Sequence, residues 1–139
     1  MDTMVNTISV EKATTSKIHD VDFDNLSFGN TYTDHMLVCE FKNGTWNTPK
    51  ILPYGPITLD PSSKIFHYGQ SIFEGMKAYK DDSGGVWLFR PLENWKRLNR
   101  SAKRLAIPEL PESHFMEGLV SLLQLEKDWV PKNPGSSLY

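Results

Sequence analysis

The chain has 139 residues, enough for one domain with a hydrophobic core and too few for two ordinary ones. Its net charge of -2 gives no general attraction to nucleic acid or to anionic membranes. Cys39 is the only cysteine, which excludes an internal disulfide and favours a reducing compartment. The sequence has neither an apolar run of membrane-spanning length nor an apolar signal segment, so we expect a cytoplasmic domain with no membrane or nucleic-acid partner.

The N-terminal part predicts a polar arm followed by short strands. Residues 1–27 form the arm, in which only 8–10 indicate a strand. β-Branched and aromatic residues predict a strand over 32–41. Asn43-Gly44 is a strong hairpin signal, and it leads into a predicted strand over 46–51.

The middle of the chain alternates between loop and strand signals. Pro49 indicates an edge or an irregular position for the strand that contains it. Prolines predict a surface loop over 53–63. Further along, 76–80 and 86–90 predict a second hairpin, turning at 82–85.

Two helices are predicted in the C-terminal part. Pro91 suits the first position of a helix, and a stripe of apolar residues continues this helix to about 106. A second helix is predicted over 111–127, ending before Trp129. The two predicted apolar faces are Leu92, Trp95, Leu98, Ala102 and Leu105 on the first helix, and Phe115, Leu119, Leu122 and Leu123 on the second.

Strands followed by helices predict an α+β fold of two layers, with two helices packed on a mostly antiparallel sheet. We expect the strands near 32–42 and 76–90 to form the centre of that sheet. Residues 137–139 resemble the beginning of a strand, so we expect the chain to be part of a longer protein.

Two kinds of site can be weighed from the residues alone. The four histidines are scattered without metal-ligand spacing, and there is no second cysteine, so no metal site is expected. Arg97, Arg100 and Arg104 lie on the first predicted helix, and Arg97 borders its apolar stripe. A solvated basic face would explain these arginines, and so would an anion site in which a guanidinium binds phosphate oxygens in pairs.

The stretch HYGQSIFEGMKAY (67–79) is dense in polar and aromatic side chains between glycines. Its aromatic residues could be core residues, with the glycines serving turns. The same composition also suits a ligand site, where glycines allow the backbone to approach closely. Lys77 could be a nucleophile only in a pocket that lowers its pKa, and the spacing leaves its role open.

A family resemblance rests on several segments in order. They are FGNTYTDHM (28–36), HYGQSIFEGMKAY (67–79), LFRPLENWKRLNRSAKRL (88–105), the following IP, and WVP with SSLY within 129–139. Together they resemble the branched-chain amino acid aminotransferases, pyridoxal-phosphate enzymes of fold type IV. The resemblance implies that residues 28–139 are the small N-terminal domain, truncated before the large domain that carries the cofactor lysine.

The resemblance also assigns roles to particular residues. Arg97, in the NxxR pattern after LFRP, would bind the phosphate of pyridoxal phosphate. Phe28, Tyr68 and Phe73 would line the pocket for the branched side chain, and Tyr139 would border the substrate. The cofactor lysine and the glutamate at the pyridine nitrogen would lie downstream, so Lys77 is read as a strand lysine and no catalytic residue is expected in this chain.

The implied activity is transamination in branched-chain amino acid biosynthesis and metabolism. Leu, Ile or Val would exchange its amino group with 2-oxoglutarate, giving a branched 2-oxo acid and glutamate. The implied assembly is a homodimer that includes the chain's own large domain, and the chain by itself is expected to be inactive. The alternatives are another type IV enzyme, of the D-amino acid aminotransferase or aminodeoxychorismate lyase type, and a non-catalytic phosphate- or flavin-binding module.

Overall fold

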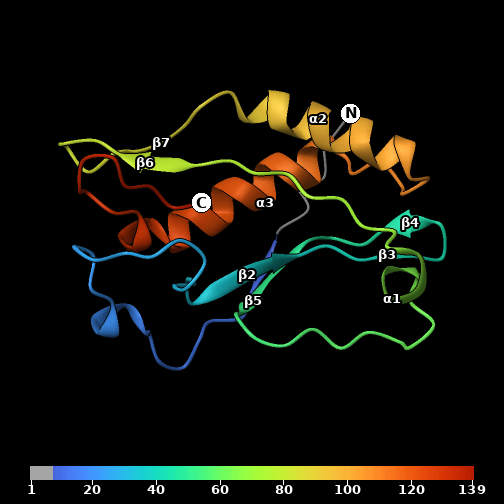
Figure 1. Ribbon diagram of the computed structural model, residues 1–139, viewed down its shortest axis with the longest axis horizontal. Helices are drawn as coiled ribbons and strands as arrows, with labels where there is room; N and C mark the ends of the chain where they lie inside the picture. Colours follow the sequence, from blue (N-terminus) through green and yellow to red (C-terminus); the bar gives the residue numbers. More distant parts are fainter. Residues whose placement is uncertain (1–7) are drawn as a thin grey trace.

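The computed structural model describes residues 8–139, and it confirms the α+β class. The first seven residues of the predicted arm lie outside the described residues. Figure 1 shows a small sheet on one side of helix α3 (Glu112–Leu125), and helix α2 (Pro91–Arg104) on the other side. α3 packs on the sheet and α2 packs on α3. Within residues 8–139, every helix is too short or too polar to cross a membrane.

The main sheet has three strands in the order β1–β5–β2. β1 (Ser9–Val10) runs parallel to β5 (Lys50–Pro53), and β2 (His35–Val38) runs antiparallel to it. Ile51 in the central strand is fully buried. On β2, Leu37 contacts the buried Gly118 of α3, where an added Cβ would overlap the leucine side chain. The helix therefore approaches the sheet closely at this glycine, and a larger residue here would require the Leu37 side chain to move.

The predicted strand over 32–41 is too long, because it divides at residues 39–40 into β2 and β3 (Phe41–Lys42). β3 forms the predicted hairpin with β4 (Thr45–Trp46). Asn43 and Gly44 at the turn have φ of 54° and 80°, the left-handed values that a two-residue hairpin turn requires. The predicted strand over 46–51 also divides, since Pro49 lies between β4 and β5 and cannot donate a ladder hydrogen bond.

The second hairpin is confirmed but is shorter than predicted. It pairs β6 (Ala78–Lys80) with β7 (Val86–Leu88). Asp81 fastens the turn by accepting hydrogen bonds from Ser83, Gly85 and Trp87, and these bonds lower the pKa of its carboxyl to about 2. Between the predicted loop and this hairpin lies a short helix that the sequence did not predict, α1 (Lys64–Tyr68), closed by Gly69 in the left-handed conformation.

The expectation that 32–42 and 76–90 form one sheet is wrong. β2 belongs to the three-stranded sheet, while β3–β4 and β6–β7 are separate two-stranded sheets. Periodicity identifies a strand but says nothing of its partner, which depends on where the connecting segments lead.

Both long helices lie where they were predicted, and their packing is uneven. In α2, Ala102 is buried, whereas Leu92 and Leu105 at the two ends of the stripe are exposed. Asn99 was not expected in the core, yet it is buried because its amide exchanges hydrogen bonds with the backbone of Leu110. This polar clamp fixes the connection between α2 and α3.

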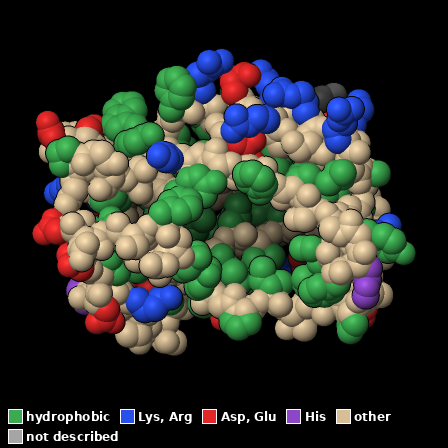
Figure 2. Space-filling model, in the orientation of Figure 1, with side chains coloured by type: hydrophobic (Ala, Val, Ile, Leu, Met, Phe, Trp, Pro, Cys, Tyr) green, Lys and Arg blue, Asp and Glu red, His purple; other side chains and the backbone are tan. Residues whose placement is uncertain are grey.

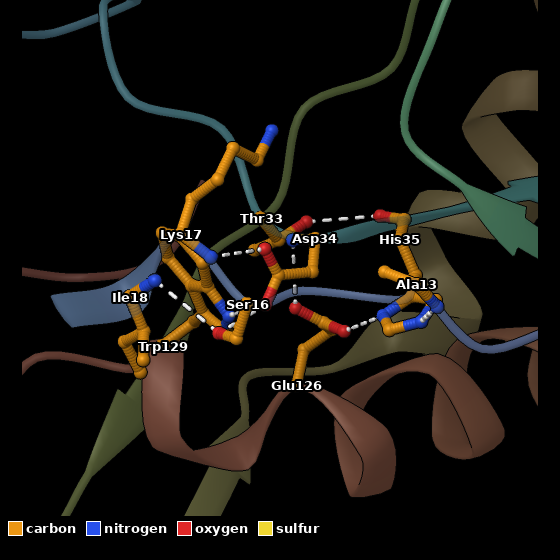
Figure 3. A network of polar contacts seen from close by, with 9 residues as sticks. All are labelled: Ala13, Ser16, Lys17, Ile18, Thr33, Asp34, His35, Glu126 and Trp129. Carbon is orange, nitrogen blue, oxygen red and sulfur yellow. Dashed lines mark hydrogen bonds and ion pairs between the residues drawn. The ribbon is translucent and has the colours of Figure 1, made fainter. Parts of the chain in front are cut away.

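A buried polar network joins three parts of the chain (Figure 3). Glu126, just after α3, accepts hydrogen bonds from the backbone N–H of Asp34 at 3.1 Å and from Nδ1 of His35. The Nε2 atom of His35 accepts the backbone N–H of Ala13 at 2.8 Å. The proton of the neutral ring is therefore on Nδ1, which makes the imidazole a donor to Glu126.

The carboxylate of Asp34 forms the second half of this network. It accepts the backbone N–H of Lys17 at 2.9 Å, the hydroxyl of Ser16 at 2.5 Å and the indole N–H of Trp129 at 3.3 Å. Burial alone would raise the pKa of Asp34, but these hydrogen bonds outweigh burial and leave the pKa below its usual value. Residues 13–17 of the predicted arm are thereby fixed onto the domain.

We predict that Glu126→Gln lowers the free energy of unfolding by about 1–3 kcal/mol. A glutamine has one side-chain acceptor oxygen in place of two, so either Asp34 N–H or His35 Nδ1–H would face an NH2 group. Urea denaturation of the chain measures the effect. Glu117→Gln is the matched control, because Glu117 is an exposed glutamate on α3, the helix that Glu126 follows. Equal stability of the two variants would contradict a structural role for the network.

Candidate functional site

The first candidate site is a hollow of about 430 Å³ between α2 and the segment that leads into β6, which we call the arginine cavity. Four of its lining residues are basic and one is acidic. Its lining residues include Gly75, Met76, Lys77, Tyr79, Phe89, Arg90, Glu93, Asn94, Arg97 and Arg100. This excess of positive charge makes the cavity a favourable place for an anion.

Arg97 is held at the cavity by Glu74. Its Nε atom donates to Oε2 of Glu74 at 2.8 Å, and its Nη2 atom donates to Oε1, so the pair is bidentate. The Glu74 side chain is only 7% exposed, whereas that of Arg97 is 59% exposed. Asn94 supports the same carboxylate, with Nδ2 at 3.1 Å from Oε1 and at 3.0 Å from the carbonyl oxygen of Gly75.

The pairing favours the charged forms of both partners. The hydrogen bond from Arg97 lowers the pKa of Glu74, burial opposes that change, and the hydrogen bond from Asn94 adds to it. The same hydrogen bond from Arg97 to Glu74 raises the pKa of the guanidinium above its usual value. A guanidinium and a carboxylate thus lie side by side, with the arginine facing outward.

Arg97 belongs to a ridge of basic side chains along α2. Figure 2 shows Lys and Arg side chains gathered over this helix at the upper edge of the molecule, above a hollow bordered by hydrophobic side chains. Arg100 and Arg104, the other two arginines of the predicted anion site, are exposed on the ridge. Arg100 lines the arginine cavity with Arg97, whereas Arg104 is not among its lining residues.

The second candidate site is a hollow of about 530 Å³, which we call the aromatic cavity. Phe28 and Tyr139 both line it, and their rings meet edge to face with centroids 5.3 Å apart. The Tyr139 hydroxyl lies against Gly75, where an added Cβ would overlap it. The backbone of Ala78 holds the C-terminal segment through two hydrogen bonds with Leu138, of 2.8 and 3.0 Å.

The two cavities are neighbours. Lys77 lines both, and Gly75 lines the arginine cavity while it contacts Tyr139 of the aromatic cavity. Lys77 precedes β6 and is exposed, so nothing around it supplies the dry pocket that a nucleophilic lysine needs. A ligand with an anionic end and an apolar end could span both cavities.

Two predicted site residues lie apart from these cavities. Tyr68, at the end of α1, is 82% exposed and lines a different hollow with Gln70 and Leu105. Phe73 is 87% exposed and is not among the lining residues of the cavities described here. Among residues 8–139, Arg97, the pair Phe28 and Tyr139, and Tyr68 line three different hollows, so these predicted residues do not share one cavity.

The sequence reasoning missed two residues of the site. Glu74 and Asn94 were visible only as parts of the FEG and NxxR motifs, and no spacing rule connects positions 74 and 97. The hydrogen bonds from Asn94 and Arg97 to Glu74 become visible only in the tertiary structure. Among residues 8–139, no group of three or more His, Cys, Asp or Glu side chains is placed to hold a metal ion.

We predict that Gly75→Ala displaces the Tyr139 ring with little loss of stability, since the new methyl group would meet only the far end of a side chain. The ring-current shifts that Phe28 causes on Tyr139 should disappear from the NMR spectrum. Gly55→Ala is the matched control, because Gly55 has open space around its Cβ position. Unchanged Tyr139 shifts in Gly75→Ala would show that the contact is absent in solution.

No family model matches the chain, but individual curated relatives do match it in sequence. The chain is 55% identical over 119 residues to branched-chain-amino-acid transaminase 1 of Bacillus subtilis (strain 168), covering 85% of this chain and 33% of the relative. It is 46% identical over 134 residues to branched-chain-amino-acid aminotransferase 2 of the same organism, covering 96% and 37%. It is 50% identical over 117 residues to the branched-chain-amino-acid aminotransferase of Mycolicibacterium smegmatis, covering 83% and 32%.

The chain thus spans about a third of the length of the curated relatives that it matches. The matches cover most of this chain and agree on one family name. Over most of its length, the chain is therefore related in sequence to the N-terminal part of the branched-chain-amino-acid aminotransferases.

Proposed function

We propose that the chain is the small N-terminal domain of a branched-chain amino acid aminotransferase and supplies one wall of its active site. The arm would comprise residues 1–27 and the domain residues 28–139, followed by a large domain that carries the cofactor lysine. The observation that carries this proposal is that the arginine cavity lies beside the aromatic cavity, in a chain 46–55% identical to relatives named branched-chain-amino-acid transaminase or aminotransferase.

The arginine cavity fits the phosphate of pyridoxal 5′-phosphate. Arg97 lines it and has N–H groups on Nη1 and Nη2 besides those that Glu74 occupies. Arg90, Arg100 and Lys77 would add positive charge around the anion. When bound, the cofactor supplies the electron sink for the chemistry at the substrate's α-carbon.

The aromatic side chains would form the substrate pocket. Phe28 and Tyr139 line one hollow beside the phosphate site, and their packed rings leave an apolar surface suited to a branched aliphatic side chain. Tyr68 and Phe73, which line neither cavity in this chain, would join this pocket only in the assembled protein, where their exposed rings could be covered. Excluding water from an apolar pocket favours Leu, Ile and Val, with about 1–3 kcal/mol for each methylene.

The exposed aromatic rings favour an assembled protein. Phe28, Tyr68 and Phe73 are each more than 80% exposed, and burial against another protein surface would remove their apolar rings from water. The proposed partners are the large domain of the same chain and a second subunit in a homodimer. This exposure also favours the aminotransferase over a self-contained phosphate- or flavin-binding module, whose apolar rings would be covered by its own chain.

We predict transamination by a protein that joins this chain to the large domain of the family, and no activity from residues 1–139 alone. Formation of glutamate from 2-oxoglutarate is assayed with Leu, Ile and Val as amino donors. D-Alanine and aminodeoxychorismate distinguish the alternative type IV enzymes. Turnover by residues 1–139 alone, or a clear preference for D-alanine, would contradict the proposal.

In the longer protein, we predict that Arg97→Ala weakens pyridoxal phosphate binding by about 1.5–3 kcal/mol, the size of a hydrogen bond to a charged group. Cofactor retention after dialysis measures the loss. Arg104→Ala is the matched control: it removes the same charge from the same helix at a residue outside the arginine cavity. Equal losses in the two variants would indicate a general charge effect and would exclude Arg97 as the specific anchor.

A further inference from the structure

Glu74 is an unusual neighbour for an anion site. Its carboxylate is almost fully buried and is paired with an exposed arginine that lines the cavity proposed to take a phosphate. A carboxylate in this place repels a bound anion, because like charges a few ångströms apart disfavour each other. The buried Glu74 therefore either weakens anion binding by repulsion or strengthens it by orienting Arg97.

The geometry of the Arg97–Glu74 pair favours a role for Glu74 in orienting Arg97. In the part of the chain that the structure describes, Arg97 donates to Glu74 alone, through one edge of its guanidinium. A bidentate contact fixes the plane of the guanidinium, which a single hydrogen bond to an exposed side chain would not do. The opposite edge, with Nη1, is then directed away from the carboxylate.

Glu74 is itself firmly held. Its Oε1 atom accepts hydrogen bonds from Asn94 at 3.1 Å and from the backbone N–H of Gly75 at 3.0 Å. Asn94 also binds the Gly75 carbonyl, and Gly75 contacts Tyr139. The carboxylate therefore connects the arginine to the backbone that borders the aromatic cavity.

We propose that Glu74 is a positioning residue, which orients Arg97 toward the anion and links the anion site to the Tyr139 wall. This inference rests on the proposed function only in its choice of a phosphate group as the anion. Holding a long, exposed side chain in its binding orientation before the anion arrives removes part of the entropy loss of binding. That gain outweighs the repulsion between the two anions.

Charge and orientation predict opposite results for Glu74→Gln. Removing a negative charge would strengthen phosphate binding, whereas releasing Arg97 would weaken it. The probe is inorganic phosphate, titrated into the 139-residue chain while the NMR signal of the Arg97 Nε–H group is followed. We expect Glu74→Gln to weaken phosphate binding about threefold to tenfold, the effect of losing about one hydrogen bond. The Nε–H signal should also exchange with water faster before phosphate is added.

Glu93→Gln is the matched control. Glu93 lines the same cavity and carries the same charge, but it pairs with Lys96 and is exposed. Its removal should strengthen phosphate binding or leave it within about twofold, since it changes charge alone. If Glu74→Gln strengthens binding as Glu93→Gln does, Glu74 is a competing counter-ion and the proposal is wrong.

Glu74→Asp separates orientation from charge if the glutamine variant does not fold. Aspartate keeps the charge but is one methylene shorter, so it should lose the bidentate contact and weaken phosphate binding. Binding equal to that of the unsubstituted chain would overturn the proposal, as would an Arg97 signal that does not respond to phosphate. The two proposals can fail separately. If the unsubstituted longer protein transaminates normally but Glu74→Gln binds phosphate more tightly, this inference is refuted and the proposed function stands.

Discussion

The carboxylate of Glu126 is the interaction on which the arrangement of this domain depends. It is 2% exposed, and its two oxygens accept hydrogen bonds from the backbone of Asp34 and the ring of His35. A buried carboxylate without such donors would cost several kcal/mol. These hydrogen bonds therefore hold the end of α3 in one position against the beginning of β2. Because His35 in turn binds Ala13, the same network also fixes the path of the N-terminal arm.

The position of α3 has consequences for the rest of the fold. α3 lies on the β1–β5–β2 sheet and supports α2 on its other side. Asn99 fixes α2 to the connection that leads into α3. Arg97 is on that same helix, so its position relative to the domain core is set by two buried polar contacts and not by apolar packing alone. Hydrogen bonds of this kind form only in a particular geometry. They therefore set the position of a functional side chain more precisely than apolar packing does.

The site lies where regular structure stops. The segment 71–77 has neither helix nor strand, and it passes between α2 and the C-terminal residues. Its backbone groups bind side chains: Gly75 N–H donates to Glu74, and Gly75 C=O accepts from Asn94. A strand in this place would use those groups in a ladder and would separate α2 from Tyr139. The two cavities can therefore meet because residues 71–77 form neither a helix nor a strand.

The sequence alone determined the two hairpins, the two long helices and the chemical character of this protein. Asn43-Gly44 determined a hairpin because only a few residues accept left-handed φ, and Pro91 with its apolar stripe determined α2. The motif residues identified the aminotransferase relationship. Tertiary structure alone decided that β1, β5 and β2 form one sheet, the burial of Asn99 and Glu126, and the pairing of Arg97 with Glu74. These depend on contacts between residues 11 to 92 positions apart, and a pattern of neighbouring residues carries no information about such contacts.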